Sequence, residues 1–177
     1  MAKKWESQLS IELVRLDDRL IHGQVVAGWV KVLSCTKIVV VDDEVASDPF
    51  EENLMRMAVP EGIDVEIFAA ADCNGLYQQL DRSPQKTILL FASVADILQL
   101  FSQGKLPLSK LNIGGVAFAE GREQLTESLF LSEEEIGMLA KIANAGVYVE
   151  IRPTPFDKAI DFHELLKVRD ARRLAEG

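Results

Sequence analysis

The chain has 177 residues, 48% of them hydrophobic and 27% charged, which predicts one folded globular domain and excludes a disordered chain. Acidic residues number 28 and basic residues 19, so the formal net charge of −9 argues against binding to nucleic acid or to an anionic membrane. Neither a long apolar run nor the apolar core of a signal peptide is present, so we expect a cytoplasmic protein with no membrane-inserted segment.

Apolar, strand-like runs alternate with helix-like segments along the chain. Several runs are continuous and β-branched, such as Ile38–Val41, which is typical of a strand covered on both faces in a parallel sheet. The first four runs begin about 25 residues apart, which is the length of a strand followed by a crossover helix. The predicted strands are Ile11–Leu16, Lys37–Asp42, Ile63–Phe68, Lys86–Phe91, Lys110–Gly114 and Gly146–Ile151.

Signals for helix starts and ends separate these strands. The first helix is predicted over Gly23–Leu33, where apolar residues such as Val25 and Trp29 fall on one helical stripe. Later helices begin with a side chain that can accept from the free N–H groups of the first turn, and two end at a glycine. The predicted caps are Asp48 (before Pro49), Ser93 and Ser132 (with Glu135 as capping-box partner), and the terminating glycines are Gly104 and Gly146.

The interval Gly115–Leu131 breaks the regular spacing of strands and helices. We expect a hairpin there, with residues 116–118 (VAF) and 129–131 (LFL) as its arms and Glu120-Gly121 near its turn.

The tail, residues 156–177, is predicted to be helical, with Phe156, Ile160 and Leu166 pointing inward. We expect a single domain over residues 1–177, with residues 1–9 as a flexible leader. The predicted fold class is α/β: a doubly wound, mostly parallel sheet of about six to seven strands, with helices on both faces and a small hairpin insertion. Ligands bind such folds beyond the carboxyl ends of the strands.

The loop after the first strand lies at that edge and concentrates chemically active side chains. His22 can take a phosphoryl group on a ring nitrogen, and Arg19 offers a planar cation that matches phosphate oxygens. A helix then begins, and its free N–H groups favour an anion. A solvated, charged turn is the alternative explanation of the same residues. The candidate site residues are His22 and Arg19 as catalytic groups, and Arg15, Asp17, Asp18, Gly23 and Gln24 as phosphate-binding or supporting groups.

Other features are less specific. Gly114-Gly115 either allows a close approach to a ligand or to the first loop, or forms only a tight turn. Arg152 is either a second phosphate contact or a solvated or ion-paired side chain, and His163 is expected on the surface. Motifs of dinucleotide-binding folds, P-loops and α/β-hydrolases are absent from the sequence, and no zinc-ligand spacing occurs.

The segment VRLDDRLIHGQV, residues 14–25, closely resembles the active-site signature of the enzyme IIB component of the mannose/fructose/sorbose family of the bacterial sugar phosphotransferase system. Further stretches resemble the family in the same order, so that the resemblance covers the chain from Glu12 to Pro155. These stretches are Trp29, IVVVDDEVASD (Ile38–Asp48), LNIGGVAF (Leu111–Phe118) and VYVEIRP (Val147–Pro153). After VAF the chain has Ala119 and Glu120, where many relatives carry a basic residue.

The resemblance implies an α/β sandwich with the activity of a protein-Npi-phosphohistidine–sugar phosphotransferase. In the family the histidine accepts a phosphoryl group from a phosphohistidine on the IIA component and passes it to a sugar held by the membrane IIC/IID permease. On this chain that histidine is His22. Arg19 and Arg15 stand at the arginine positions of the family, with Arg19 the better phosphate clamp, and Asp17 and Asp18 match its acidic pair.

No metal or cofactor is expected, because Arg19 and the helix N–H groups can supply the positive field that phosphoryl transfer needs. A carrier that meets two partners in turn is expected to have a shallow, exposed site with a modest apolar docking surface. The alternatives are a regulatory phosphoprotein whose His22 is read by a partner without sugar transport, a histidine phosphatase, and a Rossmann-like binding module.

Overall fold

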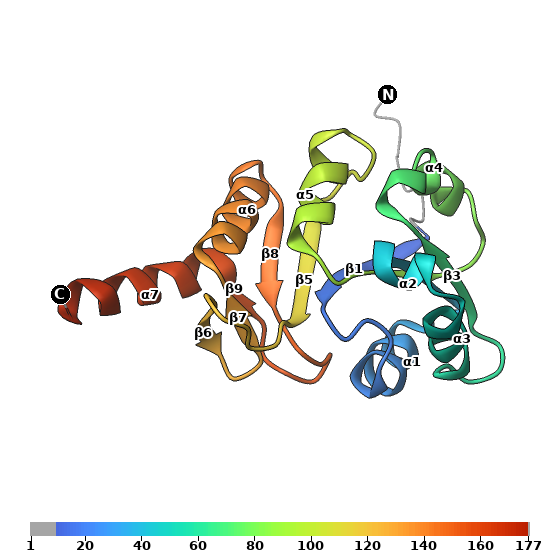
Figure 1. Ribbon diagram of the computed structural model, residues 1–177, viewed down its shortest axis with the longest axis horizontal. Coiled ribbons are helices and arrows are strands. Elements are labelled where there is room, and N and C mark those ends of the chain that lie inside the picture. The colour runs from blue at the N-terminus through green and yellow to red at the C-terminus, as the bar shows by residue number, and fades with distance from the viewer. Residues whose placement is uncertain (1–9, 177) are drawn as a thin grey trace, which may run out of the picture.

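The computed structural model describes residues 10–176, so the predicted leader, residues 1–9, lies outside the described part of the chain (Figure 1). In the described part, a seven-stranded sheet has the order β3-β2-β4-β1-β5-β8-β9, and a separate two-stranded sheet pairs β6 with β7. All neighbours in the large sheet run parallel except β9, which is antiparallel to β8. The strands are β1 (Ile11–Asp17), β2 (Lys37–Val41), β3 (Asp64–Phe68), β4 (Thr87–Phe91), β5 (Lys110–Gly115), β6 (Glu123–Thr126), β7 (Leu129–Leu131), β8 (Tyr148–Ile151) and β9 (Ile160–Asp161).

Helices connect the strands and cover both faces of the sheet, as the doubly wound prediction requires. One face packs against the helices that follow β1 and β2, through residues such as Val25 and Trp29. The other face packs against α4 to α7, through residues such as Ile97, Leu139 and Phe162. The helices are η1 (Gln24–Val30), α1 (Lys31–Leu33), α2 (Asp43–Ser47), α3 (Pro49–Met57), η2 (Ala70–Asp72), α4 (Leu76–Asp81), α5 (Val94–Ser102), α6 (Glu133–Asn144) and α7 (Phe162–Glu176).

The six predicted strands and the predicted caps are confirmed. Asp48, Ser93 and Ser132 each accept a hydrogen bond from the first turn of the helix that follows, and Ser132 forms the full capping box with Glu135. Gly104 and Gly146 follow their helices with φ of +68° and +97°, the left-handed conformation that glycine adopts without strain.

The first helix differs from the prediction in its hydrogen bonding. Gln24–Val30 forms a π-helix, and only Lys31–Leu33 is α-helical. The apolar stripe still faces the sheet, since Val25, Trp29 and Val30 are buried. A π-helical turn is uncommon and is found mostly at functional sites.

The hairpin is present, but its predicted first arm was wrong. Its strands are β6 and β7, so the turn lies at Glu127-Ser128 and not at Glu120-Gly121. Val116 directly follows β5 and instead makes a single parallel bridge to Leu129, the first residue of β7. Phe118 consequently leaves the sheet and is exposed.

The helical tail begins later than predicted. Residues 152–159 are irregular, β9 adds a short antiparallel strand, and α7 starts at Phe162 and projects from the body of the molecule (Figure 1). Phe156 and Ile160 are exposed and not inward-facing, because they precede the helix whose periodicity the prediction assumed. Phe162 is the fully buried anchor of this helix. No helix in residues 10–176 is long and apolar enough to cross a membrane.

Candidate functional site

The predicted loop lies at the carboxyl end of β1, which is a central strand between β4 and β5. The chain leaves β1 at Asp17 and turns sharply before η1 begins. Leu20, in the middle of the turn, is buried and has a φ of +51°, a conformation that costs a branched side chain free energy. Burial of Leu20 and Ile21 in the core under η1 holds the turn in place.

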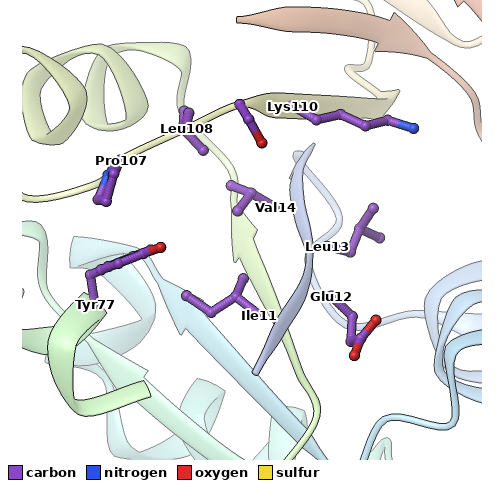
Figure 2. A pocket seen from close by; sticks show the side chains of 9 residues that line it. Ile11, Glu12, Leu13, Val14, Tyr77, Pro107, Leu108 and Lys110 are labelled. Carbon is purple, nitrogen blue, oxygen red and sulfur yellow. The ribbon is translucent and has the colours of Figure 1, made fainter. Parts of the chain in front are cut away.

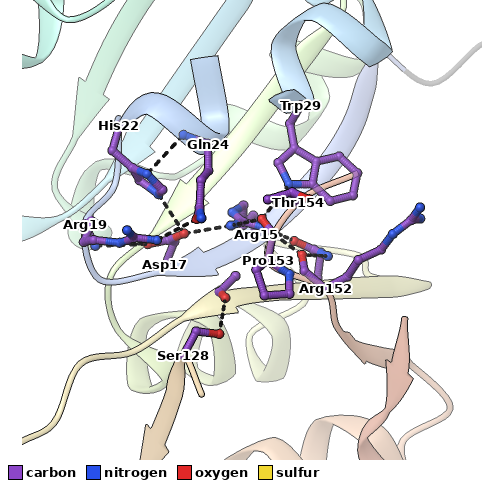
Figure 3. A network of polar contacts seen from close by, with 12 residues as sticks. Arg15, Asp17, Arg19, His22, Gln24, Trp29, Ser128, Arg152, Pro153 and Thr154 are labelled. Carbon is purple, nitrogen blue, oxygen red and sulfur yellow. Dashed lines mark hydrogen bonds and ion pairs between the residues drawn. The ribbon is translucent and has the colours of Figure 1, made fainter. Parts of the chain in front are cut away.

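Asp17 is the centre of the site (Figure 3). Its Oδ2 accepts hydrogen bonds from Nη2 of Arg15 at 2.8 Å and from Nε2 of His22 at 2.9 Å. Its Oδ1 accepts from the backbone N–H of Arg19 at 3.2 Å and from Nε of Arg19 at 3.4 Å. The Asp17 side chain is fully buried, so all four contacts act with little screening by water.

The charge state of Asp17 decides which ring nitrogen of His22 carries the hydrogen. Burial by itself would raise the pKa of the Asp17 carboxyl, but the hydrogen bond from His22 and the charges of Arg15 and Arg19 outweigh it and lower this pKa. An ionised carboxylate only accepts hydrogen bonds, so Nε2 of His22 must carry the hydrogen that bridges the two side chains. In the neutral ring, Nδ1 therefore carries the lone pair.

Nδ1 of His22 faces the start of η1. The backbone N–H of Gln24 points at Nδ1 with an N–N distance of 3.4 Å. The side chain of Gln24 accepts from Nη2 of Arg19 at 2.9 Å, which holds this half-exposed guanidinium beside the imidazole. The loop thus brings two groups that attract an anion to His22: the helix start that faces Nδ1 and the Arg19 guanidinium that shares Asp17 with Nε2.

Arg15 lies behind Asp17, and its side chain is fully buried. Its Nη1 donates to Oδ1 of Asn112 and to the carbonyl oxygen of Arg152, and its Nη2 donates to the carbonyl oxygen of Pro153 as well as to Asp17. The Trp29 ring stacks near the guanidinium, at 5.8 Å from its central carbon. Burial lowers the pKa of the Arg15 guanidinium overall, although the neighbouring Asp17 carboxylate acts to raise it. The guanidinium still remains protonated.

The glycines of β5 allow this arrangement. A Cβ at Gly114 would overlap the Arg15 guanidinium and Oδ2 of Asp17, so the close approach of Gly114 is to the first loop. Gly23, in contrast, has an ordinary helical φ of −53° and open space around it, so its lack of a side chain leaves the region beside His22 clear.

The other sequence candidates lie around this centre. Asp18 accepts from the backbone N–H of Ala117 at 2.6 Å and so ties the loop to the segment after β5, away from the imidazole. Arg152 donates to the carbonyl oxygens of Pro155 and Asp157 and lies over Trp29, an arrangement that leaves it a structural role. His163 is exposed on α7.

Asn112 is a contact of Arg15 that the sequence reasoning missed. A signal for it was available, because Asn112 and Glu150 are polar residues inside runs that were otherwise predicted to be buried strands.

A cavity of about 120 Å³ lies at the opposite end of the sheet from the loop (Figure 2). It is lined by the start of β1, Tyr77 and the segment from Pro107 to Lys110, and none of the loop residues reaches it. Sites in open parallel sheets form at the carboxyl ends of the strands, so we assign the chemistry to the loop and not to this cavity.

Comparison with known proteins identifies the family. The model of the family described as PTS system sorbose subfamily IIB component, where PTS denotes the phosphotransferase system, matches residues 11–175. The chain belongs to this family. The matched range extends beyond Pro155 into α7, further than the sequence resemblance suggested.

Individual relatives are similar over most of their length. The fructose-specific EIIB component of Bacillus subtilis is 30% identical over 90% of this chain and 97% of its own length. The N-acetylgalactosamine-specific IIB component 2 of Escherichia coli is 34% identical over 89% of this chain and 99% of its own length. The crystal structure of the IIBSor domain of the sorbose permease from Klebsiella pneumoniae superimposes with a TM-score of 0.79 at 31% identity, covering 89% of this chain and 96% of that one.

Membership of the family makes the chain a IIB component, and so a transferase of the sugar phosphotransferase system. Such components work with IIA and IIC/IID partners in general. The family also favours this activity over the histidine phosphatase and the Rossmann-like binding module.

Proposed function

We propose that His22 of this IIB component accepts a phosphoryl group on Nδ1 from a phosphohistidine of a IIA protein. The group then passes to a sugar held by a IIC/IID permease. The observation that carries the proposal is the hydrogen bond between Nε2 of His22 and the ionised, buried Asp17, because it leaves Nδ1 as the nucleophile.

In the transfer step, the Nδ1 lone pair forms the new bond to phosphorus while the bond from phosphorus to the donor nitrogen breaks. The His22 ring then carries a substituent on Nδ1 and a hydrogen on Nε2, so it bears a positive charge. Asp17 stabilises that charge at 2.9 Å without moving, since its position is already fixed by Arg15 and Arg19. The preorganised carboxylate lowers the barrier because it does not have to reorient during the reaction.

The phosphoryl oxygens need positive partners of their own. The Gln24 N–H that faces Nδ1, and the half-exposed Arg19 that Gln24 holds, are the nearest such groups. Phosphoryl transfer passes through a loose, charge-rich transition state, so alignment and electrostatic stabilisation supply most of the rate. Arg19 is therefore the phosphate clamp, and Arg15 acts only through Asp17.

Access to the site suits two partners in turn. The His22 side chain is 16% exposed and the Arg19 side chain 51% exposed. Phe118 and Phe156 are strongly exposed on the two segments that contact the site, one through Asp18 and one beside Pro155, which packs on Gly28. We propose that these exposed rings contribute to a modest apolar docking surface for a partner protein.

The test is phosphorylation in a reconstituted relay of phosphoenolpyruvate, enzyme I, the phosphocarrier protein and a IIA protein, followed by intact mass. We expect one acid-labile, base-stable phosphoryl group on the wild-type protein and none on His22→Ala. His163→Ala is the control and is expected to gain one group. A His22→Ala protein that still gains the group would disprove the assignment.

A further inference from the structure

A row of polar side chains crosses the sheet behind the site. Arg15 on β1 is in register with Asn112 on β5, and Asn112 is in register with Glu150 on β8. All three side chains are buried, with exposures of 0%, 0% and 2%. The residues that alternate with them, such as Leu16, Ile113 and Val149, point into the apolar core on the opposite face of the sheet, so the three polar side chains lie on one face.

The hydrogen bonds of Asn112 determine the orientation of its amide. Nδ2 of Asn112 donates to Oε1 of Glu150 at 3.1 Å and to the carbonyl oxygen of Arg152 at 3.2 Å. Both partners are acceptors, so the amide nitrogen must face them and the amide oxygen must face Arg15. Asn112 therefore presents an acceptor to the guanidinium because Glu150 occupies its donor side.

The row ends at the surface. Oε2 of Glu150 pairs with Nζ of Lys110 at 2.9 Å, and Lys110 lies half-exposed over the Tyr148 ring. Both oxygens of the buried Glu150 carboxylate thus have a partner, which removes most of the cost of burying this charge. The continuous chain of contacts runs from Lys110 through Glu150, Asn112, Arg15 and Asp17 to His22.

We infer that Asn112 and Glu150 are positioning residues for phosphoryl transfer, which act through Arg15 and Asp17 to keep the hydrogen of His22 on Nε2 and the lone pair on Nδ1. The inference rests on the proposed function for its kinetic consequence, but the state of His22 is measurable in the unphosphorylated protein. Without Asn112, Nη1 of Arg15 keeps only the carbonyl oxygen of Arg152, at 3.2 Å. Arg15 then holds Asp17 less firmly, and the contact that selects the tautomer of the imidazole weakens.

The test compares Asn112→Leu and Glu150→Leu with the conservative variant Glu150→Gln. The glutamine can still accept from Nδ2 of Asn112, so we expect it to behave as the wild-type protein. The control is Thr87→Val, which alters a buried polar residue of β4 whose hydroxyl donates to the Gln85 carbonyl and does not contact the polar row. Asn112→Ser replaces Asn112→Leu if the leucine variant does not fold.

Two readouts are needed. Two-bond ¹H–¹⁵N correlation spectra of the His22 ring report which nitrogen carries the hydrogen, and quenched-flow transfer from phosphorylated IIA reports the rate. In both leucine variants we expect a measurable population of the Nδ1–H tautomer. We also expect the transfer rate to fall by about fivefold, as follows from the loss of one buried hydrogen bond. Thr87→Val is expected to change neither.

The outcomes separate the two proposals. If the leucine variants keep the wild-type ring spectrum, Asn112 and Glu150 are merely structural and the inference is wrong, whatever the transfer rate. If the ring spectrum changes but the wild-type protein accepts no phosphoryl group, the positioning of His22 stands and the proposed function fails.

Discussion

The two arginines that contact Asp17 differ in exposure: Arg15 is buried and Arg19 is half-exposed. Arg15 is fully buried and bonds to Asp17, Asn112 and two backbone carbonyls, whereas half of the Arg19 side chain faces solvent beside His22. A fully buried guanidinium whose two Nη atoms make four hydrogen bonds has no exposed face to offer an incoming phosphoryl group. The exposed one can, because half of it faces solvent and its side-chain contacts within residues 10–176 are with Asp17 and Gln24.

This division predicts different effects for the same substitution at the two positions. Arg19→Lys is expected to keep wild-type stability and to slow phosphoryl transfer at least about tenfold, because an ammonium group cannot reproduce the two-pronged contact. Arg15→Lys is expected to lose about 3 kcal/mol in the free energy of unfolding, since it breaks a buried, multiply bonded ion pair. Urea denaturation and quenched-flow transfer measure the two effects. A stable Arg15→Lys protein combined with a fast Arg19→Lys protein would reverse the assignment of the clamp.

Gly114 is the second position where a single side chain decides the geometry. A Cβ there overlaps the Arg15 guanidinium and Asp17, so Gly114→Ala is expected to cost about 1–3 kcal/mol of stability and to slow transfer to His22. Gly137 on α6 is the matched control, because it is exposed with no atom near its missing Cβ. Gly137→Ala is expected to stabilise the protein by about 0.5–1 kcal/mol and to leave transfer unchanged. Equal behaviour of the two variants in thermal unfolding would contradict the packing around Arg15.

At the scale of single elements, local capping residues define several helix starts, and tertiary contacts reinforce one of them. In α6, Ser132 accepts from the Glu135 N–H at 3.1 Å while Glu135 accepts from the Ser132 N–H at 2.8 Å. Arg122, from the loop before β6, forms an ion pair with the same carboxylate. The capping box was predictable because its two residues are three apart in the sequence, whereas the contribution of Arg122 depends on how the hairpin folds against α6.

The charge of Glu135 makes part of the stability depend on pH. Burial would raise the pKa of its carboxyl, but the hydrogen bonds from Arg122 and Ser132 lower it overall. A carboxyl with a lowered folded-state pKa stabilises the protein above its unfolded-state value of about 4.3, and this contribution is lost as the pH falls through the folded-state pKa. Glu135→Gln keeps the capping hydrogen bond but not the charge. We expect it to be about 1 kcal/mol less stable than wild type at pH 7 and nearly equal to wild type at pH 3. A difference between the two proteins that persists unchanged at pH 3 would refute this explanation.

The whole molecule consists of a sheet with separate apolar cores on its two faces, and α7 joins the second core only at its beginning. Phe162 is completely buried there, while residues near the far end of the helix, such as Leu174, are exposed. Ion pairs from Arg169 and Arg173 to Glu123 and Glu133 connect the middle of α7 to the hairpin and to α6. The side chains of Glu133 and Arg173 are more than half exposed, where ion pairs contribute little, while Arg169 is 12% exposed; we therefore assign most of the attachment of α7 to Phe162.

Removal of this anchor tests the assignment. Phe162→Ala is expected to lower the free energy of unfolding by about 3–5 kcal/mol and to increase amide hydrogen exchange along α7. Leu174→Ala, a truncation of an 85% exposed side chain in the same helix, is expected to stay within about 0.5 kcal/mol of wild type. If exchange in α7 stays slow in Phe162→Ala, the ion pairs hold the helix after all.

The amino-acid sequence alone determined the parts of this protein that depend on neighbours along the chain. The β-branched runs predicted the strands of the parallel sheet, serine and aspartate predicted the helix starts, and residues 14–25 indicated the family. The same residues are the basis for proposing His22 as the reacting residue. Each of these signals lies within a few residues, where backbone geometry and local hydrogen bonding are decisive. Only the tertiary structure decided which residues share the site from a distance. Asn112 and Glu150 reach Arg15 because β5 and β8 pair in register beside β1, and strand order and register follow from packing on both faces of the sheet. The start of α7 and the arms of the hairpin were decided in the same way, by contacts between segments that are distant in the sequence.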